Sequence, residues 1–166
     1  MKLVNSVILF FGLYLSTLSI SHAENCQTDN EYLRAMPDND LTIVDDNGEA
    51  LNFVVRLAAD NVSRAAGFQW VCESVIEDKP ILFIFEEAGI PQFHMRNVVA
   101  PIDIAFIDSE GRIESIQSMA PYVLVSKYRP LYSPKREVVA ALEVHKGFYQ
   151  KHQIAVGASV SWNSVK

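Results

Sequence analysis

Short strand-like runs, each closed by a turn signal, recur along the chain from residue 41 onward. Alternating or continuous apolar runs of this kind, spaced about eight to twelve residues apart, are typical of all-β sandwiches and barrels. We expect eight or nine short strands and one or two short helices, in a mainly β, single-domain antiparallel β-sandwich or barrel. The runs that carry this prediction are 41–58, 80–85, 93–97, 101–108, 112–119, 136–144 and 154–162.

Turn and capping residues predict one hairpin and the positions of the short helices. The run 41–58 contains Asp46-Asn47-Gly48, which predicts a hairpin between two strands. Asp60 is a good N-cap for a short helix that ends at Gly67. The segment 146–152 is predicted to be the second short helix or a turn.

The N-terminus reads as an export signal. Lys2 is followed by an apolar stretch, and Ser21-His22-Ala23 has the small residues that a signal peptidase recognises. We therefore expect a signal peptide over 1–23, a polar N-terminal tail over 24–40 and a β domain over 41–166. The alternative is an uncleaved membrane anchor. Cleavage would make the protein periplasmic or secreted, with no stable membrane insertion.

The mature chain is acidic. Removing 1–23 leaves 143 of the 166 residues with a net charge of −7, because the charge of −6 for the whole chain includes Lys2. An acidic surface repels nucleic acid, so we expect no nucleic-acid partner. The densest basic stretch, 127–136, is interpreted as a solvated loop.

Two cysteines remain in the mature chain, Cys26 and Cys72. In an exported protein this pair predicts one disulfide between the N-terminal tail and the segment after the first helix. The alternatives are a free thiol pair or a metal pair, although no CxxC-type spacing supports them.

From about Asn52 to Val160 the chain resembles the DUF192 family of small, often exported prokaryotic proteins. The resemblance rests on segments in a fixed order: Arg64-x-x-Gly67-Phe68, LFIFEE (82–87), FHMRN (93–97), PIDIAFID (101–108), EGRI (110–113), Ala120-Pro121, ALE (141–143), Gly147 and IAVGASV (154–160). His94 and Val98 stand where the family usually has tryptophan and threonine. Phe68-Gln69 stands where it has Leu-Met. The resemblance implies a mainly β, jelly-roll-like sandwich and supplies no function.

Two carboxylates sit within otherwise apolar strands. Asp103 shares one face of its strand with Ala105 and Ile107, and Glu143 shares a face of its strand with Val139 and Ala141. A buried carboxylate needs a partner, since burying it alone costs several kcal/mol. One hypothesis is a set of structural ion pairs among Arg64, Arg96, Asp103 and Glu143.

The other hypothesis is a polar ligand-binding pocket formed by His94, Arg96, Asn97, Asp103 and Glu143. Aromatic side chains near such a pocket could stack on a ligand. The candidates are Phe93, Tyr122, Tyr128, Tyr132 and Trp70. This pattern favours a non-catalytic binding or accessory protein for a small polar ligand or envelope component, with a saccharide as one candidate.

A hydrolase acting on envelope or extracellular carbohydrate is the alternative, with Asp103 and Glu143 as the acid and base. His94, His145, His152, Asp103 and Glu143 could provide metal ligands, but they lack HxH or HExxH spacing, so we expect no metal and no cofactor. A third possibility is a scaffold that acts only through protein partners. The oligomeric state is left open by the sequence.

Overall fold

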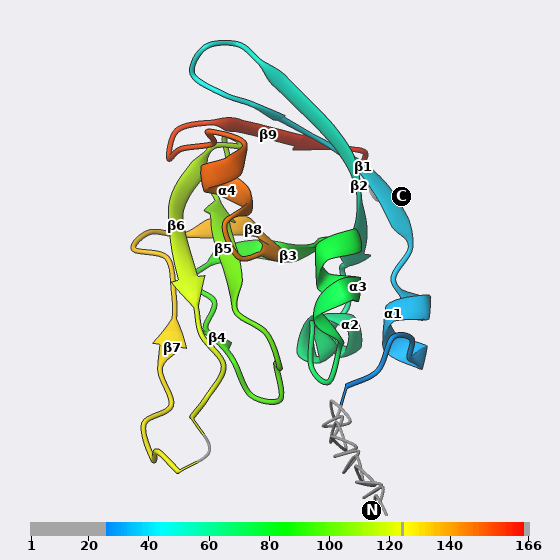
Figure 1. Ribbon diagram of the computed structural model, residues 1–166. Helices are drawn as coiled ribbons and strands as arrows, with labels where there is room; N and C mark the ends of the chain where they lie inside the picture. The colour runs from blue at the N-terminus through cyan, green and yellow to red at the C-terminus, as the bar shows by residue number, and fades with distance from the viewer. Residues whose placement is uncertain (1–25, 124, 165–166) are drawn as a thin grey trace, which may run out of the picture.

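The computed structural model describes residues 26–123 and 125–164, and it is mainly β with a single domain, as predicted (Figure 1). The expected signal peptide over 1–23 lies outside these residues. The strands are β1 (Asp38–Val44), β2 (Ala50–Ala58), β3 (Ile81–Gly89), β4 (Phe93–His94), β5 (Ile102–Ile107), β6 (Ile113–Met119), β7 (Leu131–Tyr132), β8 (Val138–His145) and β9 (Ser159–Trp162).

Four short helices accompany the strands, where the sequence predicted one or two. They are α1 (Glu31–Ala35), α2 (Asn61–Ala66), α3 (Glu73–Asp78) and α4 (Phe148–Lys151). The helix α1 lies in the segment expected to be a polar tail, and it buries Leu33. In the described ranges, no helix is long and apolar enough to cross a membrane.

Seven strands form one sheet in the order β6-β5-β8-β3-β2-β1-β9, and β4 pairs with β7 in a small second sheet. Most neighbours are antiparallel, as expected. The pair β2 and β3 is parallel, with Arg56 opposite Ile81. A parallel pair needs a crossover connection, and α2 and α3 lie in the segment that provides it.

Hydrogen bonds between the two edges close the seven-stranded sheet on itself. The Ile113 N–H donates to the Ala158 carbonyl over 3.0 Å, and the Val160 N–H donates to the Gly111 carbonyl over 2.6 Å. Gly111 has a φ of +73°, and a Cβ there would lie 2.8 Å from the Val160 carbonyl oxygen. Only glycine fits this close approach without a shift of the backbone. The sheet therefore forms a barrel-like structure.

Buried side chains form two clusters, one on each face of this sheet. The barrel cluster includes Leu41, Leu142 and Val144, together with Phe148 from α4. The helix cluster lies on the other face, where Phe83 and Ile104 pack with Leu33, Ile76 and other residues around α1 and α3. On β5, for example, Ile104 and Phe106 point to the helix cluster, and Ala105 and Ile107 point to the barrel cluster.

The local turn and capping signals are confirmed. The Asp45 carboxylate accepts from the N–H groups of Asn47 and Glu49 in the β1–β2 turn. The Asp60 carboxylate accepts from Val62 and Ser63 at the start of α2. The Asp60 bonds satisfy N–H groups that otherwise have no partner at a helix start.

The strand predicted over 93–97 is wrong beyond its first two residues. Only Phe93 and His94 pair with β7. A turn follows, in which Val98 N–H donates to the Met95 carbonyl, and Asn97 has a φ of +59°. Asparagine tolerates this left-handed conformation better than most residues, whereas a strand cannot contain it.

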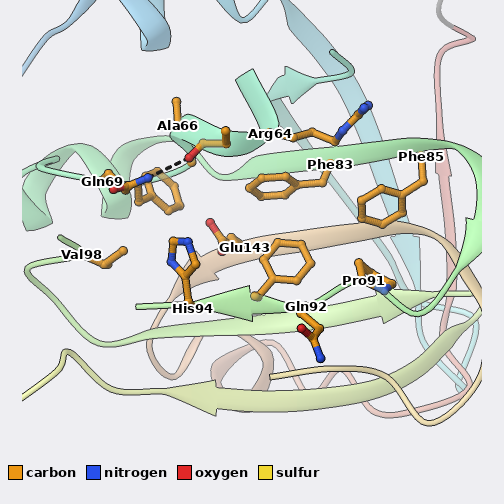
Figure 2. A pocket seen from close by; sticks show the side chains of 14 residues that line it. Arg64, Ala66, Gln69, Phe83, Phe85, Pro91, Gln92, His94, Val98 and Glu143 are labelled. Atoms are coloured by element: carbon orange, nitrogen blue, oxygen red, sulfur yellow. Dashed lines mark hydrogen bonds between the residues drawn. The ribbon is translucent and has the colours of Figure 1, made fainter. Parts of the chain in front are cut away.

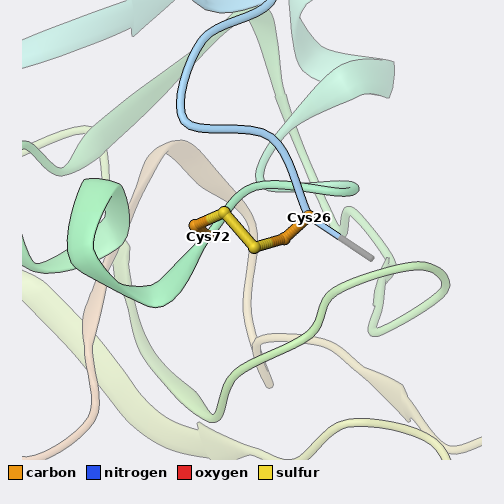
Figure 3. Close-up of a disulfide and its surroundings, with 2 residues drawn as sticks. All are labelled: Cys26 and Cys72. Carbon is orange, nitrogen blue, oxygen red and sulfur yellow. A yellow bond between two sulfur atoms is a disulfide. The ribbon is translucent and has the colours of Figure 1, made fainter. Parts of the chain in front are cut away.

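The predicted disulfide joins Cys26 to Cys72 (Figure 3). Backbone hydrogen bonds run beside it, from the Gln27 N–H to the Trp70 carbonyl and from the Cys72 N–H to the Gln27 carbonyl. The start of the described chain is thus fastened to the segment between α2 and α3.

Candidate functional site

A pocket of about 270 Å³ opens between α2, β3 and β4 on the helix-cluster face of the sheet. Figure 2 shows the Glu143 side chain pointing into it, with His94 and Phe83 on either side. Its volume is just below the range of about 300–1,000 Å³ that is usual for pockets holding drug-sized ligands. A ligand here would be small. The lining residues are Arg64, Ala65, Ala66, Gly67, Phe68, Gln69, Phe83, Phe85, Pro91, Gln92, Phe93, His94, Val98 and Glu143.

Glu143 is the buried carboxyl of this pocket, with 5% of its surface exposed. It comes from β8, which lies between β5 and β3, and it is opposite Ile81 of β3 and Ile104 of β5. Its Oε2 atom has no hydrogen-bond partner among the residues that the structure describes. Burial raises the pKa of the carboxyl from 4.5 to about 8, because the charged form loses its hydration. Glu143 is therefore mainly protonated at neutral pH.

Gly67 leaves space above this carboxyl. It ends α2 with a φ of +46°, a conformation that L side chains rarely adopt. A Cβ at this position would lie 3.8 Å from the Glu143 Oε2 atom and 3.6 Å from the Phe83 ring. A side chain larger than a methyl group would therefore extend into the pocket next to the Glu143 carboxyl.

Within the described residues, Arg64 forms no salt bridge with a carboxylate, contrary to the ion-pair hypothesis. Its guanidinium donates to the carbonyls of Ala59 and Ile84 over 2.6 and 2.9 Å, and to Asn61 Oδ1 over 2.6 Å. In Figure 2 the guanidinium points away from Glu143. Arg64 therefore fastens α2 to the edge of β3.

Asp103 lies on the opposite face of the sheet from the pocket. It is 6% exposed, and its carboxylate accepts from the Ser118 hydroxyl over 2.6 Å and from the Gly147 N–H over 2.7 Å. These two bonds join β5 to β6 and to the turn before α4. The expected grouping of Asp103 with Glu143 in one site is wrong, because the pairing of β5 with β8 places the two carboxyls on different faces.

Arg96 and Asn97 also lie outside the Glu143 pocket. Both line a separate groove together with Trp70 and Tyr122. Arg96 is exposed and forms no salt bridge within the described residues. The Asn97 amide donates to Gln69 Oε1 over 3.0 Å, and this bond links the turn after β4 to the segment that covers the pocket.

Of the other aromatic candidates, Tyr128 and Tyr132 also lie outside the described lining of the pocket. Phe93 is the one predicted aromatic residue that reaches it.

The remaining histidines are far from forming a metal site. His145 and His152 both pack against the Phe148 ring, at centroid distances of 5.5 and 4.7 Å. Among residues 26–123 and 125–164, no three histidine, cysteine or acidic side chains gather closely enough to hold a metal ion. Of the predicted ligand-binding set, the structure thus brings together His94 and Glu143.

Comparison with known proteins gives a family for this fold. The model of DUF192, described as an uncharacterised ACR, matches residues 42–162. The chain belongs to the DUF192 family. No curated protein matches the chain.

Two crystal structures share the fold of this DUF192 protein, each with a TM-score of 0.67. One is a proposed transcription regulator from Sinorhizobium meliloti 1021, 23% identical, with 76% of this chain and 95% of that chain covered. The other is a protein of unknown function from Novosphingobium aromaticivorans DSM 12444, 21% identical, with coverage of 84% and 95%. At this level of identity the likeness establishes the fold alone.

Sequence reasoning missed most of the pocket wall. Phe83 and Phe85 were predicted only as part of a buried strand, and Gln69 was not singled out as a pocket residue. The period-2 alternation of β3 places the two phenylalanines on one face. That signal identifies their common face, but not what lies opposite them.

Proposed function

We propose that this DUF192 protein is an exported, non-catalytic binding protein that holds a small polar ligand against Glu143. The observation that carries this proposal is the buried Glu143 carboxyl, whose Oε2 atom faces a pocket and has no partner in the described part of the chain. A buried polar atom without a hydrogen bond costs free energy, and a ligand that supplies one recovers it.

The residues around Glu143 suit binding better than chemistry. Phe83, Phe85 and Phe93 provide apolar contact, while His94 and Gln92 place polar groups at the lining. Pockets that bind small molecules combine apolar contact with a few polar groups that fix orientation.

The alternative function, a carbohydrate hydrolase, would need a second carboxyl group at the pocket, and Asp103 does not provide it. A glycosidase needs two carboxyl groups that flank the same bond, about 5 to 9.5 Å apart across an open site. Asp103 is on the far face of the sheet and is held by Ser118 and Gly147. The geometry therefore favours a single carboxyl that recognises a ligand.

Export is supported by two features. The Cys26–Cys72 bridge belongs to an oxidising compartment, and the sequence of residues 1–23 has the form of a signal peptide. The net charge of −7 for the chain after residue 23 weighs against a nucleic-acid partner.

A thermal-shift screen of the chain from residue 24 onward tests the proposal. The panel contains sugars, amines, amino acids and cell-envelope fragments. A pocket ligand at 100 times its Kd stabilises the folded state by about 2.7 kcal/mol, which raises the Tm measurably. We expect the same compound to have little effect on Glu143→Leu, which removes the carboxyl.

Glu137→Gln is the matched control, because Glu137 is an exposed acid just before the same strand. It should respond like the wild type. If every compound that stabilises the wild type stabilises Glu143→Leu equally, the ligand binds elsewhere and the proposal is wrong.

A further inference from the structure

We propose that the ligand of the Glu143 pocket carries a cationic amine, either a protonated amine or a quaternary ammonium, that pairs with the Glu143 carboxylate beside aromatic rings. This inference rests on the proposed function, and it names the class of ligand. It is argued from the wall of the pocket, from the charges nearby and from the proton that Glu143 has to release.

The wall of the pocket is aromatic on several sides. Phe83 and Phe93 stand edge to face with ring centroids 5.1 Å apart, and Phe85 continues the row along β3. Figure 2 shows the Phe83 and Phe85 side chains on the same side of the strand, with the Glu143 carboxyl near Phe83. Ring faces attract cations within about 6 Å, most strongly where water is excluded. A carboxylate together with several rings is the combination that suits an ammonium group.

Arg64 and Gln69, the lining residues that could donate to an anionic ligand from the α2 side, are already engaged in hydrogen bonds. The Arg64 guanidinium is bonded to two backbone carbonyls and to Asn61. The Gln69 side chain donates to the Ala65 carbonyl over 2.8 Å and accepts from Asn97. The other polar side chains among the described lining residues, apart from Glu143, are His94 and Gln92. Apart from the protonated Glu143 carboxyl itself, an anion would find few free donors here.

A neutral sugar fits this wall less well than an amine does. Sugars need hydrogen-bond partners for several hydroxyl groups, and the four phenylalanine rings of the lining provide none. An amino sugar would satisfy the proposal, because its ammonium group could occupy the same place. The inference therefore concerns the charged group of the ligand and leaves the rest of the molecule open.

Binding of an ammonium group replaces the proton of Glu143 with the cation of the ligand. Glu143 releases its proton to solvent as the cation enters, so the pocket stays neutral overall. Among the described residues, the other titratable side chains that line the pocket are Arg64 on α2 and His94 on β4. Tyr149 lies across the sheet, where burial, Asp103 and Glu143 all raise its pKa. Since burial raises the pKa of Glu143 to about 8, a quaternary ammonium should bind about tenfold more tightly per pH unit between pH 6 and 8. Above pH 8 the affinity should level off.

Isothermal titration calorimetry with a matched pair of probes tests this inference. Choline carries a quaternary ammonium, and 3,3-dimethyl-1-butanol has nearly the same shape without the charge. We expect choline to bind at least tenfold more tightly than the alcohol at pH 8. Titrations at pH 6.5 in two buffers of different protonation enthalpy should show close to one proton released per choline bound.

Two variants separate the carboxylate from the rings. Glu143→Gln keeps the shape of the side chain, and it should lose choline binding at least tenfold together with the proton release. Phe85→Leu keeps an apolar wall but removes a ring face, so it should weaken choline several-fold and leave the alcohol unchanged. Equal loss of both probes in Phe85→Leu would contradict the cation–π argument.

The outcomes also distinguish this inference from the proposed function. If the alcohol or other neutral compounds bind in a Glu143-dependent manner and choline and ethanolamine do not, the pocket is a binding site but the cationic class is wrong. If neither charged nor neutral probes bind in a way that depends on Glu143, both proposals fall together.

Discussion

Asp103 and Glu143 lie on neighbouring paired strands but on opposite faces of the seven-stranded sheet. In the register of β5 with β8, Glu143 is opposite Ile104 and Asp103 is opposite Val144. Adjacent residues of a strand point to opposite faces, so this register separates the two carboxyls. Asp103 consequently supports the end of the barrel near α4, while Glu143 faces the pocket.

Asp103→Ala should destabilise the protein by about 2–4 kcal/mol. The change leaves the Gly147 N–H and the Ser118 hydroxyl without their acceptor, and hydrogen bonds to charged groups are worth about 1.5–3 kcal/mol each. Urea unfolding followed by circular dichroism measures the loss. Ser118→Ala is the control and should cost less, since it removes one of the two bonds. A loss near zero in Asp103→Ala would show that the Asp103 carboxylate does not stabilise the fold.

Glu143→Gln should change how stability depends on pH. The unfolded wild-type chain loses the Glu143 proton near pH 4.5, whereas the folded chain keeps it to about pH 8. The unfolded state therefore binds fewer protons in this window, and the stability contributed by Glu143 falls as the pH rises from 4.5 to 8.

The glutamine variant has no proton to lose. Its free energy of unfolding should match that of the wild type near pH 4.5 and exceed it by up to about 5 kcal/mol at pH 9. Each unit of pKa difference corresponds to about 1.4 kcal/mol. Unfolding free energies of both proteins at a series of pH values give the comparison. A difference that stays constant with pH would mean that folding does not raise the pKa of Glu143.

Arg64→Lys should cost about 1–3 kcal/mol of stability. A lysine ammonium cannot reach the Ala59 and Ile84 carbonyls and Asn61 with the planar spread of a guanidinium. Arg96→Lys is the matched control, because Arg96 is exposed, and its effect should stay within about 0.5 kcal/mol. Equal effects of the two substitutions on thermal unfolding would contradict the assignment of Arg64 as the anchor of α2.

Reduction of Cys26–Cys72 should lower the Tm. The bridge closes a loop between residues 46 positions apart, and loop entropy assigns to it about 3–4 kcal/mol. Differential scanning calorimetry with and without reductant measures the change, and the double variant Cys26→Ser with Cys72→Ser should reproduce it. An unchanged Tm under reductant would show that the backbone bonds of Gln27 hold this segment alone.

The sequence predicted the strands and their faces well, because period-2 alternation is a local property. It assigned Asp103 to the face of Ala105 and Ile107, and Glu143 to the face of Ala141, and the two core clusters agree. It could not predict how the faces of β5 and β8 combine. That depends on the register between two strands far apart in the chain, which no local pattern specifies.

The prediction that Arg96 lies in a strand was wrong because it also rested on a local pattern. Phe93 and Met95 alternate with His94 and Arg96, which predicts a strand, yet β4 ends at His94 and a turn follows.

The short helix α3 was not predicted from the sequence. Its N-cap residue Cys72 makes no side-chain capping bond, so the usual sequence signal for a helix start is absent there.

The pKa of Glu143, measured by carbon NMR of its side-chain carboxyl in the unliganded protein, tests the central claim most directly. A buried carboxyl without a partner for Oε2 should titrate near pH 8. A titration near pH 4.5 would show that the carboxyl is hydrated or paired, and it would remove the basis for a ligand site at Glu143.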